Sequence, residues 1–521
     1  MKLQKYLLGI DAGISVTKAA LFDSSGAEIQ TVSRKSTLIS PQTGWAEVSM
    51  TETWDMTAAA IRELLALTRI KSSQIAGVGV TGNMVGVWLI DVQGRPVRNA
   101  ILVCDTRTRP LFEQLTRQQP DILHRIYCSS GCVMEFGCTL PLMRWLTEHE
   151  PESLRKAQAV LCCKDWLCYQ LTGSIHLDYT EASVLPGDNR KRTYSEPLFD
   201  LLGISQWRRL LPRVVASEQI VGQVTPQAAE ITGLCAGTPV TAGAGDVPSS
   251  TIGAGAVETG RACTVLGTTC HSSFVIPQPS FEPPDVGLLF ALPEALWLRT
   301  MVNLTGTPNL DWAIEQFCGL EASQAASRRE LFEIVQTLAQ QGPPGANGVI
   351  YHPYLNPVGV IAPFVEPTAR AQFFGITNAH RRHDLLRAVY EGVALAIRDC
   401  YDAIGMPEEI RLVGGGAQSE FWCQIIADCT GSRIVIPKGS EFGAKGAALL
   451  AAVGLHWFDN IAEAARATVS IGRTYQPNPD VKALYDAVYA TYFQLRTDLR
   501  ASWQLQYRGQ RNRVFDKNPV S

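Results

Sequence analysis

Apolar and polar positions at the start of the chain alternate as they do in a strand hairpin. An apolar run over residues 6–10 and a second over 18–22 flank the turn Asp11-Ala-Gly13. A weaker alternation after this pair predicts a third strand. The N-terminus is therefore predicted to form a small antiparallel sheet with a glycine at the tip of its first hairpin.

The next segment changes to helical spacing and then returns to strands. Ser49 and Glu52 stand three residues apart, as in a capping box, and the apolar residues after them recur at helical spacing. Continuous apolar runs predict buried strands over 75–81 and 85–91. Strands and helices keep alternating beyond this point, which is typical of the α/β class.

The pattern of the first hairpin begins again in the second half of the chain. Predicted strands over 261–266 and 272–275 flank Gly267-Thr-Thr269. Two halves, each led by a hairpin with a glycine at its tip, indicate a duplicated architecture with a cleft between two domains. We predict three parts: an N-terminal domain over 1–255, a C-terminal domain over 256–480, and a terminal helix and tail over 481–521.

Size, composition and charge restrict the class of protein. A chain of 521 residues is long enough for two domains, and 46% hydrophobic with 18% charged residues fits a folded globular protein. The net charge of −3 argues against a nucleic-acid partner, and no apolar run is long enough for a membrane span. The 14 cysteines form no C-x-x-C pair. Since the first residues do not read as a secretory leader, we expect reduced thiols and a cytoplasmic protein.

The turn of the first hairpin has residue types that suit a phosphate group. Gly13 lets backbone N–H groups approach an anion closely, Ser15 could add a donor, and Lys18 a charge. Asp11 could hold Mg²⁺ through water. Gly267-Thr-Thr269 repeats this chemistry in the second half. A solvated hairpin is the simpler interpretation of either turn alone, but two equivalent turns predict that one triphosphate is held from both halves.

A third glycine-rich segment follows the apolar residues Ile410-Arg-Leu412. Gly414, Gly415 and Gly416 stand between this predicted strand and a predicted helix, which favours a nucleotide lying against the loop. The segment is neither a P-loop nor a dinucleotide fingerprint, because the required lysine and glycine spacings are missing. Close packing of the helix on the strand is the open alternative.

Asp246 is the strongest candidate for a catalytic group. It follows Gly243-Ala-Gly245 and precedes Val247-Pro248, at the predicted start of a helix. One interpretation is a simple helix N-cap. The other is a carboxylate that accepts the proton of an attacking hydroxyl during phosphoryl transfer. We favour the second interpretation.

Taken in order, these motifs resemble the FGGY carbohydrate kinase family, which is related to actin, hexokinase and the heat-shock chaperones. The resemblance runs from Leu8 to about Leu455. It is carried by Gly9–Gly13 with Lys18, Gly44–Glu47, Thr81–Met84, Asp105–Arg107, Lys164-Asp165 with Leu171–Gly173, Gly243–Asp246, Gly267–Thr269, Phe374–Ile376, Glu391-Gly392, Gly414–Gln418 and Gly443–Ala448. It implies two ribonuclease-H-like domains with a cleft between them, an ATP-dependent kinase, Mg²⁺ as the metal, and a small sugar or polyol as the substrate.

The resemblance also implies a role for particular residues of this chain. Asp246 would be the catalytic base, and Asp11 and Asp246 would hold the metal. The sugar site would be lined by Asn83, Met84, Val85, Asp105 and Asp246. The predicted nucleotide-binding residues are Asp11, Gly13, Ser15, Lys18, Gly267, Thr268, Thr269, Gly306, Gly414, Gly415, Gly416 and Gln418.

The chain departs from the family pattern at several polar positions. Ile14 stands where the family usually has threonine in the first phosphate loop. Val85 replaces a histidine of D-xylulose kinases, and Val103-Cys104 replaces a frequent Trp-Asn pair. Segments 40–47 and 309–312 look more like the L-xylulose and erythritol kinase branch. We therefore expect a pentulose, a pentitol or a tetritol as the substrate.

Two other functions are compatible with the same motifs. A nucleotide-binding sugar sensor without turnover would explain Ile14, but it would not need a base at Asp246. A chaperone-like or actin-like ATPase would not need sugar-site residues at Asn83 and Asp105. We expect no nucleic-acid or membrane partner, and a homodimer is kept open.

Overall fold

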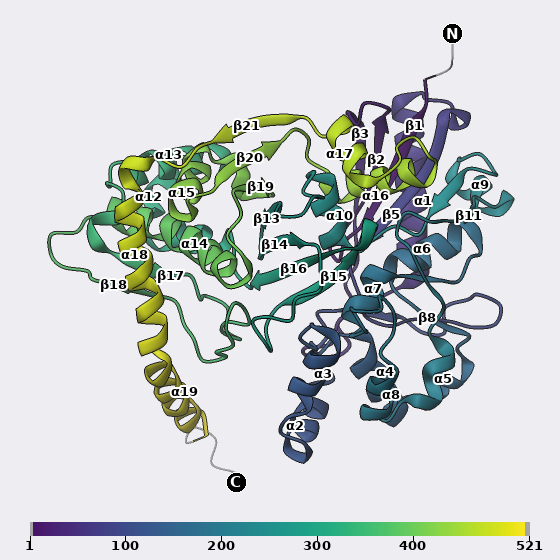
Figure 1. The fold of residues 1–521 in the computed structure, drawn as a ribbon, viewed down its shortest axis with the longest axis horizontal. Helices are drawn as coiled ribbons and strands as arrows, with labels where there is room; N and C mark the ends of the chain where they lie inside the picture. Colours follow the sequence, from purple (N-terminus) through teal and green to yellow (C-terminus); the bar gives the residue numbers. More distant parts are fainter. Residues whose placement is uncertain (1–3, 516–521) are drawn as a thin grey trace. The chain divides into compact units, whose positions relative to one another are not determined.

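The chain folds into two compact units that are each assembled from separate segments. The computed structural model describes residues 4–515 (Figure 1). Unit 1 contains the residues up to Thr259, Val275–Arg299 and Lys438–Ser470, and unit 2 contains Gly260–Phe274, Thr300–Pro437 and the residues from Ile471 onward. Two segments of the C-terminal domain expected from the sequence, Val275–Arg299 and Lys438–Ser470, therefore belong to unit 1. The last six residues of the expected tail, 516–521, lie outside the described residues.

Unit 1 is built on a six-stranded sheet with the strand order β11-β12-β5-β1-β2-β3. β1 is antiparallel to β2 and parallel to β5, and β5 is in turn parallel to β12. The predicted N-terminal hairpin and third strand are confirmed. The bounds are Tyr6–Ala12 for β1, Val16–Asp23 for β2, Glu28–Lys35 for β3, Ile75–Gly82 for β5, Ile220–Gln223 for β11 and Pro239–Thr241 for β12.

Short strands and helices complete unit 1. Ser49 caps the first helix, because its side chain accepts a hydrogen bond from the backbone N–H of Glu52, as the sequence predicts. The short strands are β4 (Glu47–Val48), β6 (Trp88–Ile90), β7 (Ala100–Ile101), β8 (Ala159–Leu161), β9 (Leu177–Asp178), β10 (Val214–Val215) and β15 (Leu288–Leu292). The helices are α1 (Met50–Thr68), α2 (Arg109–Gln118), α3 (Ile122–Ser130), α4 (Thr139–His149), α5 (Pro151–Lys156), α6 (Cys163–Thr172), α7 (Tyr179–Val184), α8 (Glu196–Leu201), α9 (Pro226–Thr232), α10 (Asp246–Gly253), α16 (Phe442–Gly454) and α17 (Ile461–Thr468).

The strand expected over 85–91 is wrong in its first half. Only Trp88–Ile90 forms a strand. Val85 and Gly86 have φ angles of 53° and 79°, in the left-handed region, which an extended strand cannot include. The residues from Asn83 to Val87 therefore form a loop after β5.

Helix α16 lies against β1 and β5 at a distance that only glycine allows. A Cβ atom on Gly9 would stand 2.0 Å from the carbonyl oxygen of Ala444, and one on Gly79 would stand 1.9 Å from that of Ala447. Real Cβ contacts are never this short, so both strand positions require glycine. This contact brings a segment from late in the sequence onto the N-terminal sheet.

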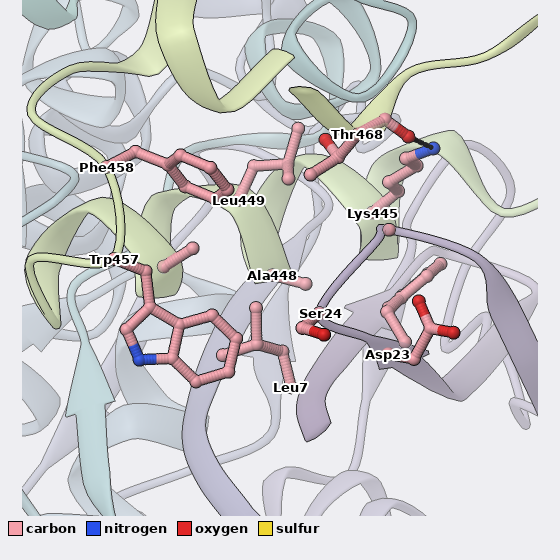
Figure 2. Close-up of a pocket in the computed structure, with 12 residues that line it drawn as sticks. Leu7, Asp23, Ser24, Lys445, Ala448, Leu449, Trp457, Phe458 and Thr468 are labelled. Carbon is pink, nitrogen blue, oxygen red and sulfur yellow. Dashed lines mark hydrogen bonds between the residues drawn. The ribbon is translucent and has the colours of Figure 1, made fainter. Parts of the chain in front are cut away.

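One edge of α16 carries a buried lysine beside a small apolar pocket (Figure 2). Leu7, Ala448 and Trp457 line this pocket together with the stem of Lys445. The Lys445 side chain donates a hydrogen bond from Nζ to the carbonyl oxygen of Thr468, at 3.0 Å. Burial lowers the pKa of Lys445 below its ordinary value. The amine is therefore held against α17 rather than released to solvent.

Unit 2 contains the second glycine-tipped hairpin. β13 is antiparallel to β14 and parallel to β19, β19 is parallel to β20, and β20 is antiparallel to β21. The strands are β13 (Ala262–Leu266), β14 (Cys270–Ile276), β16 (Leu296–Asn303), β17 (Ile350–His352), β18 (Gln372–Phe374), β19 (Glu409–Val413), β20 (Arg433–Pro437) and β21 (Ile471–Tyr475), of which β14 and β16 each extend into unit 1 at one end. The helices are α11 (Pro308–Phe317), α12 (Gly319–Gln324), α13 (Arg328–Ala339), α14 (Arg382–Ile404), α15 (Glu420–Thr430), α18 (Pro479–Asp498) and α19 (Arg500–Phe515).

The single terminal helix expected from the sequence is two consecutive helices, α18 and α19, with Leu499 between them (Figure 1). The cysteines expected to be reduced are all free thiols, and most of them are buried. Among residues 4–515, no helix has both the length and the apolar character that crossing a membrane requires.

Candidate active site

The first hairpin places Asp11 and the predicted phosphate loop next to the predicted sugar loop. The backbone N–H of Gly13 donates to the carbonyl oxygen of Val16 at 3.0 Å, which closes the turn. Ala12 accepts two hydrogen bonds from Asn83, one from the backbone N–H at 2.9 Å and one from Nδ2 at 3.0 Å. The end of β1 is thereby fixed to the loop that follows β5. Asn83 Oδ1 is buried and has no partner within the described structure.

Lys18 faces Asp11 across the hairpin, but it forms an ion pair with Glu441, the N-cap residue of α16. The two residues are register partners in the β1–β2 pair. The Lys18 Nζ atom lies 2.7 Å from Glu441 Oε2. The sequence did not predict Glu441 as the partner of Lys18. More than 400 positions separate the two residues, and no local motif links them. Lys18 is therefore a poor candidate for a free phosphate-binding cation.

Asp246 occupies the first turn of α10. Gly245 is the N-cap, so the N-cap interpretation of Asp246 is wrong. Asp246 Oδ1 accepts a hydrogen bond from the backbone N–H of Val247 at 2.8 Å. Gly243, with a φ of 71°, lets the chain pass so close to β5 that a Cβ there would stand 1.7 Å from the Val80 carbonyl oxygen. This approach brings the start of α10 toward the end of β1.

The Asp11 carboxyl group adds to the cost of ionising Asp246. Burial raises the pKa of Asp246 to about 7, and the Asp11 carboxylate adds to that rise. Burial also raises the pKa of Asp11 to about 6, against the opposing effect of Lys18. A divalent cation bound by both carboxylates would offset the repulsion between their negative charges. The chemistry of this donor pair therefore fits Mg²⁺.

Close contacts join the predicted sugar residues to this pair. A Cβ on Gly245 would lie 2.3 Å from Met84 Sδ. The Met84 thioether therefore packs directly against Gly245, the residue before Asp246. Asn83, Met84 and Val85 are each less than 10% exposed. The structure thus gathers Asp11, the loop after β5 and Asp246 within unit 1.

Asp105 differs from the sequence prediction in a specific way. Its side chain is fully buried, and Oδ2 accepts from the backbone N–H of Ala46 at 2.6 Å. Arg107 donates to both carboxylate oxygens, and its guanidinium carbon lies 3.9 Å above the Trp45 ring. A carboxylate that already accepts these bonds is not free for a sugar hydroxyl. The Asp105 carboxylate therefore holds this loop in place, and its contact with a sugar stays a prediction.

The second group of predicted residues lies in unit 2, around the tip of the β13–β14 hairpin. Gly306 donates from its N–H to the Thr268 carbonyl oxygen at 2.8 Å, and Thr307 donates in the same way to Gly267 at 2.8 Å. A Cβ on Gly306 would stand 2.4 Å from the Gly267 carbonyl oxygen. Thr268 remains exposed at the tip, while the Thr269 hydroxyl is hydrogen-bonded to His271.

The triple glycine lies beside this hairpin because β13 and β19 are paired. Gly414 has a φ of 93°, and a Cβ there would be 2.6 Å from the Leu266 carbonyl oxygen. Gly416 is packed equally closely on the Leu266 side chain. Gly415 has no atom within 4 Å of a would-be Cβ, and Gln418 is exposed. Gly414 and Gly416 therefore both allow close packing on Leu266, and Gly414, Gly415 and Gln418 are exposed on the other side of the loop.

Comparison with known proteins identifies the family. Models of the FGGY family of carbohydrate kinases match residues 6–253 as its N-terminal domain and residues 262–455 as its C-terminal domain. Erythritol kinase of Brucella abortus is 31% identical over 508 residues, which is 95% of this chain and 97% of that protein. The chain belongs to the FGGY family of carbohydrate kinases.

Other relatives of this FGGY kinase extend over the same length. A probable L-xylulose kinase of Pasteurella multocida is 32% identical over 95% of this chain and 99% of its own. The solved structure of xylulose kinase from Rhodospirillum rubrum has a TM-score of 0.86 at 26% identity, and the match covers 96% of this chain and 100% of that one. The predictions of a two-domain α/β kinase fold and of a carbohydrate kinase are confirmed. The relatives support a kinase and not a sugar sensor.

The raised pKa of Asp246 predicts an unusual dependence of stability on pH. The folded protein binds the Asp246 proton more tightly than the unfolded chain does. The free energy of unfolding therefore falls as the pH rises from about 4 to about 7. Without nucleotide or metal, Asp246→Asn should raise the free energy of unfolding by about 1–3 kcal/mol at pH 8 and by almost nothing near pH 4.

Thermal melts in a chelating buffer at several pH values would measure this effect. Asp55→Asn is the matched control, because Asp55 is an exposed acid on α1 of the same unit. A gain at pH 8 no larger than that of the control would mean that the Asp246 carboxyl is not strained by its setting.

Proposed function

We propose that this FGGY kinase transfers the γ-phosphoryl group of ATP to a hydroxyl of a pentulose, pentitol or tetritol. The observation that carries the proposal is the placement of Asp246 beside Asp11, behind a glycine turn and at the start of α10. Asp246 accepts the proton of the substrate hydroxyl while the hydroxyl oxygen bonds to the γ-phosphorus. The bond from that phosphorus to the bridging oxygen breaks, and ADP leaves.

Asp11 and Asp246 hold Mg²⁺ in this proposal. The metal would neutralise charge on the phosphate oxygens. In unit 1, Ile14 and Ser15 would offer their backbone N–H groups to a phosphate, because the Gly13 N–H is already bonded to the Val16 carbonyl oxygen. Within unit 2, the exposed positions Thr268, Gly414, Gly415 and Gln418 suit contacts to a nucleotide, and Gly267, Thr269, Gly306 and Gly416 give these loops their shape.

The substrate class is supported by the sugar loop and by the relatives. Met84 and Val85 offer apolar side chains where other kinases of the family place polar or charged groups. A proton of a substrate hydroxyl therefore has few side-chain partners besides Asp246, and Asn83 Oδ1 is a free buried acceptor. The relatives named above as erythritol kinase and probable L-xylulose kinase favour tetritols and L-pentuloses over D-xylulose and glycerol.

A panel of acceptors tests this proposal. ADP release would be followed with erythritol, L-xylulose, D-xylulose, several pentitols and glycerol, each with MgATP and with a blank lacking the acceptor. We expect the largest kcat/KM with a tetritol or an L-pentulose. The substrate class is wrong if glycerol or D-xylulose exceeds both by more than tenfold.

Ile14 gives a separate test of the phosphate loop. Its side chain packs against the core of unit 1. Ile14→Thr would restore one hydroxyl, and a single hydrogen bond to a charged group is worth about 1.5–3 kcal/mol, so KM for ATP should fall by no more than about 10- to 150-fold. Steady-state kinetics with varied ATP would measure it. A wild-type protein without turnover that becomes an active kinase through this change would contradict the proposal.

A further inference from the structure

A buried polar cluster lies behind the sugar site and has no part in the function proposed so far. Lys164, Asp165, Asp178 and Glu181 are all fully buried in unit 1. The Lys164 Nζ atom lies 2.5 Å from Asp165 Oδ1 and 2.9 Å from Asp178 Oδ1. Buried charges are costly unless they are paired, and here Lys164 is paired with Asp165 and Asp178.

Asp178 uses the cluster to fix the short helix α7. Its side chain caps the helix by accepting from the backbone N–H of Thr180 at 2.9 Å and from that of Glu181 at 3.3 Å. It also accepts from the hydroxyl of Ser217 at 2.6 Å. The side chains of the first helical turn are thereby held in fixed directions.

Glu181 reaches from α7 to the sugar loop. Its Oε2 atom accepts a hydrogen bond from the backbone N–H of Val85 at 2.9 Å. Val85 is the residue with a φ of 53°, a conformation that costs a β-branched residue about 1–2 kcal/mol. Without the Glu181 carboxylate, the buried N–H of Val85 would have no hydrogen-bond acceptor. Nothing would then offset the cost of the left-handed backbone at Val85.

Thr180 reaches from the same turn to the loop that carries the base. Its Oγ1 atom accepts a hydrogen bond from the backbone N–H of Gly245 at 2.9 Å, and its hydroxyl donates to Asp178 Oδ1 at 2.9 Å. Gly245 is the N-cap of α10 and directly precedes Asp246. The direction of the Asp246 carboxylate thus depends on a hydrogen bond to Thr180.

We propose that Thr180 and Glu181 are positioning residues of the kinase: Glu181 sets the sugar loop at Val85, and Thr180 sets the base at Asp246. This inference rests on the function proposed above. Neighbouring residues of one helical turn hold the two sides of the sugar site, so both sides share one rigid support. The support is the ion pair of Lys164 with Asp178.

Paired substitutions separate the two roles. Glu181→Ala should raise KM for the sugar at least about tenfold and leave KM for ATP within about twofold. Thr180→Val should instead lower kcat at least about tenfold. Glu181→Gln and Thr180→Ser keep an oxygen acceptor and should each restore the affected constant to within about threefold of wild type. Gln also suits the site because burial raises the pKa of Glu181 well above its ordinary value.

Ser130→Ala is the matched control for a loss of stability alone. Ser130 is fully buried on α3, and its hydroxyl is hydrogen-bonded only to nearby backbone groups of Ile126 and Cys132. Its variant should melt at a lower temperature with unchanged kinetic constants. Glu181→Ala and Thr180→Val variants that behave like this control would overturn the proposal.

Amide hydrogen exchange provides a readout that does not need turnover. Peptides covering 83–86 should lose protection in Glu181→Ala but not in Thr180→Val, and peptides covering 243–246 should show the reverse. If the wild type phosphorylates no sugar but this pattern appears, the proposed function fails and the positioning stands. If turnover is present and neither peptide changes, the positioning fails and the proposed function stands.

Discussion

Asp246→Asn is expected to lower kcat for the accepted sugar about 10²–10⁴-fold, because general-base catalysis typically contributes that factor. Asparagine has almost the same size and can still accept the 2.8 Å hydrogen bond from the backbone N–H of Val247. It cannot take up a proton at neutral pH. The loss should therefore appear in turnover, while the fold and the binding of ATP are retained. Steady-state kinetics with nucleotide-binding titrations would measure both.

The Asp55→Asn variant serves again as the control for a lost surface carboxylate, and it should keep wild-type kcat. Thermal melts must show that the Asp246→Asn protein is at least as stable as wild type, in line with the strain on its carboxyl group. Wild-type turnover in a folded Asp246→Asn protein would rule out Asp246 as the base.

Gly79→Ala is expected to destabilise unit 1 by about 3 kcal/mol or more, because the added methyl group cannot be accommodated. Its Cβ would stand 1.9 Å from the carbonyl oxygen of Ala447 and 2.3 Å from the carbonyl carbon. Helix α16 would have to move off β5. This helix also carries Gly443, where a Cβ would stand 2.3 Å from Asp11 Oδ2, so activity should fall together with stability.

Calorimetry would detect the change as a fall in melting temperature of about 4 °C or more. Gly173→Ala is the control in the same unit, because Gly173 has a φ of 74° but no atom within 4 Å of a would-be Cβ. It should cost only about 1 kcal/mol, from the left-handed backbone alone. Equal melting temperatures for Gly79→Ala and wild type would contradict the close packing of α16 on the sheet.

Local features of the site could be predicted from the sequence because their cause is local. The Asp11-Ala-Gly13 turn follows from two apolar runs and a glycine, and the capping of α1 follows from Ser49 and Glu52. The start of a helix at Asp246 follows from the glycines before it and the proline after it. Order and spacing of such pieces were enough to identify the family.

Features that depend on distant partners could not be predicted. The Asp105 carboxylate looks available in the sequence, but Ala46, 59 positions earlier, donates to it in the fold. Val85 has a strand-forming side chain, and only the tertiary contact with Glu181 explains its left-handed backbone. The placement of Lys438–Ser470 in unit 1 depends on backbone contacts between α16 and glycines of the sheet. No local periodicity encodes these contacts.

Phosphorus NMR of the reaction mixture tests the central claim most directly. Purified protein would be incubated with MgATP and, in turn, with each pentulose, pentitol and tetritol. We predict that at least one acceptor yields a phosphate monoester and ADP in equal amounts, and that the Asp246→Asn protein forms both about 10²–10⁴-fold more slowly. Free phosphate without a sugar monoester, or no ADP with any acceptor, would contradict the account of this chain as a sugar or polyol kinase.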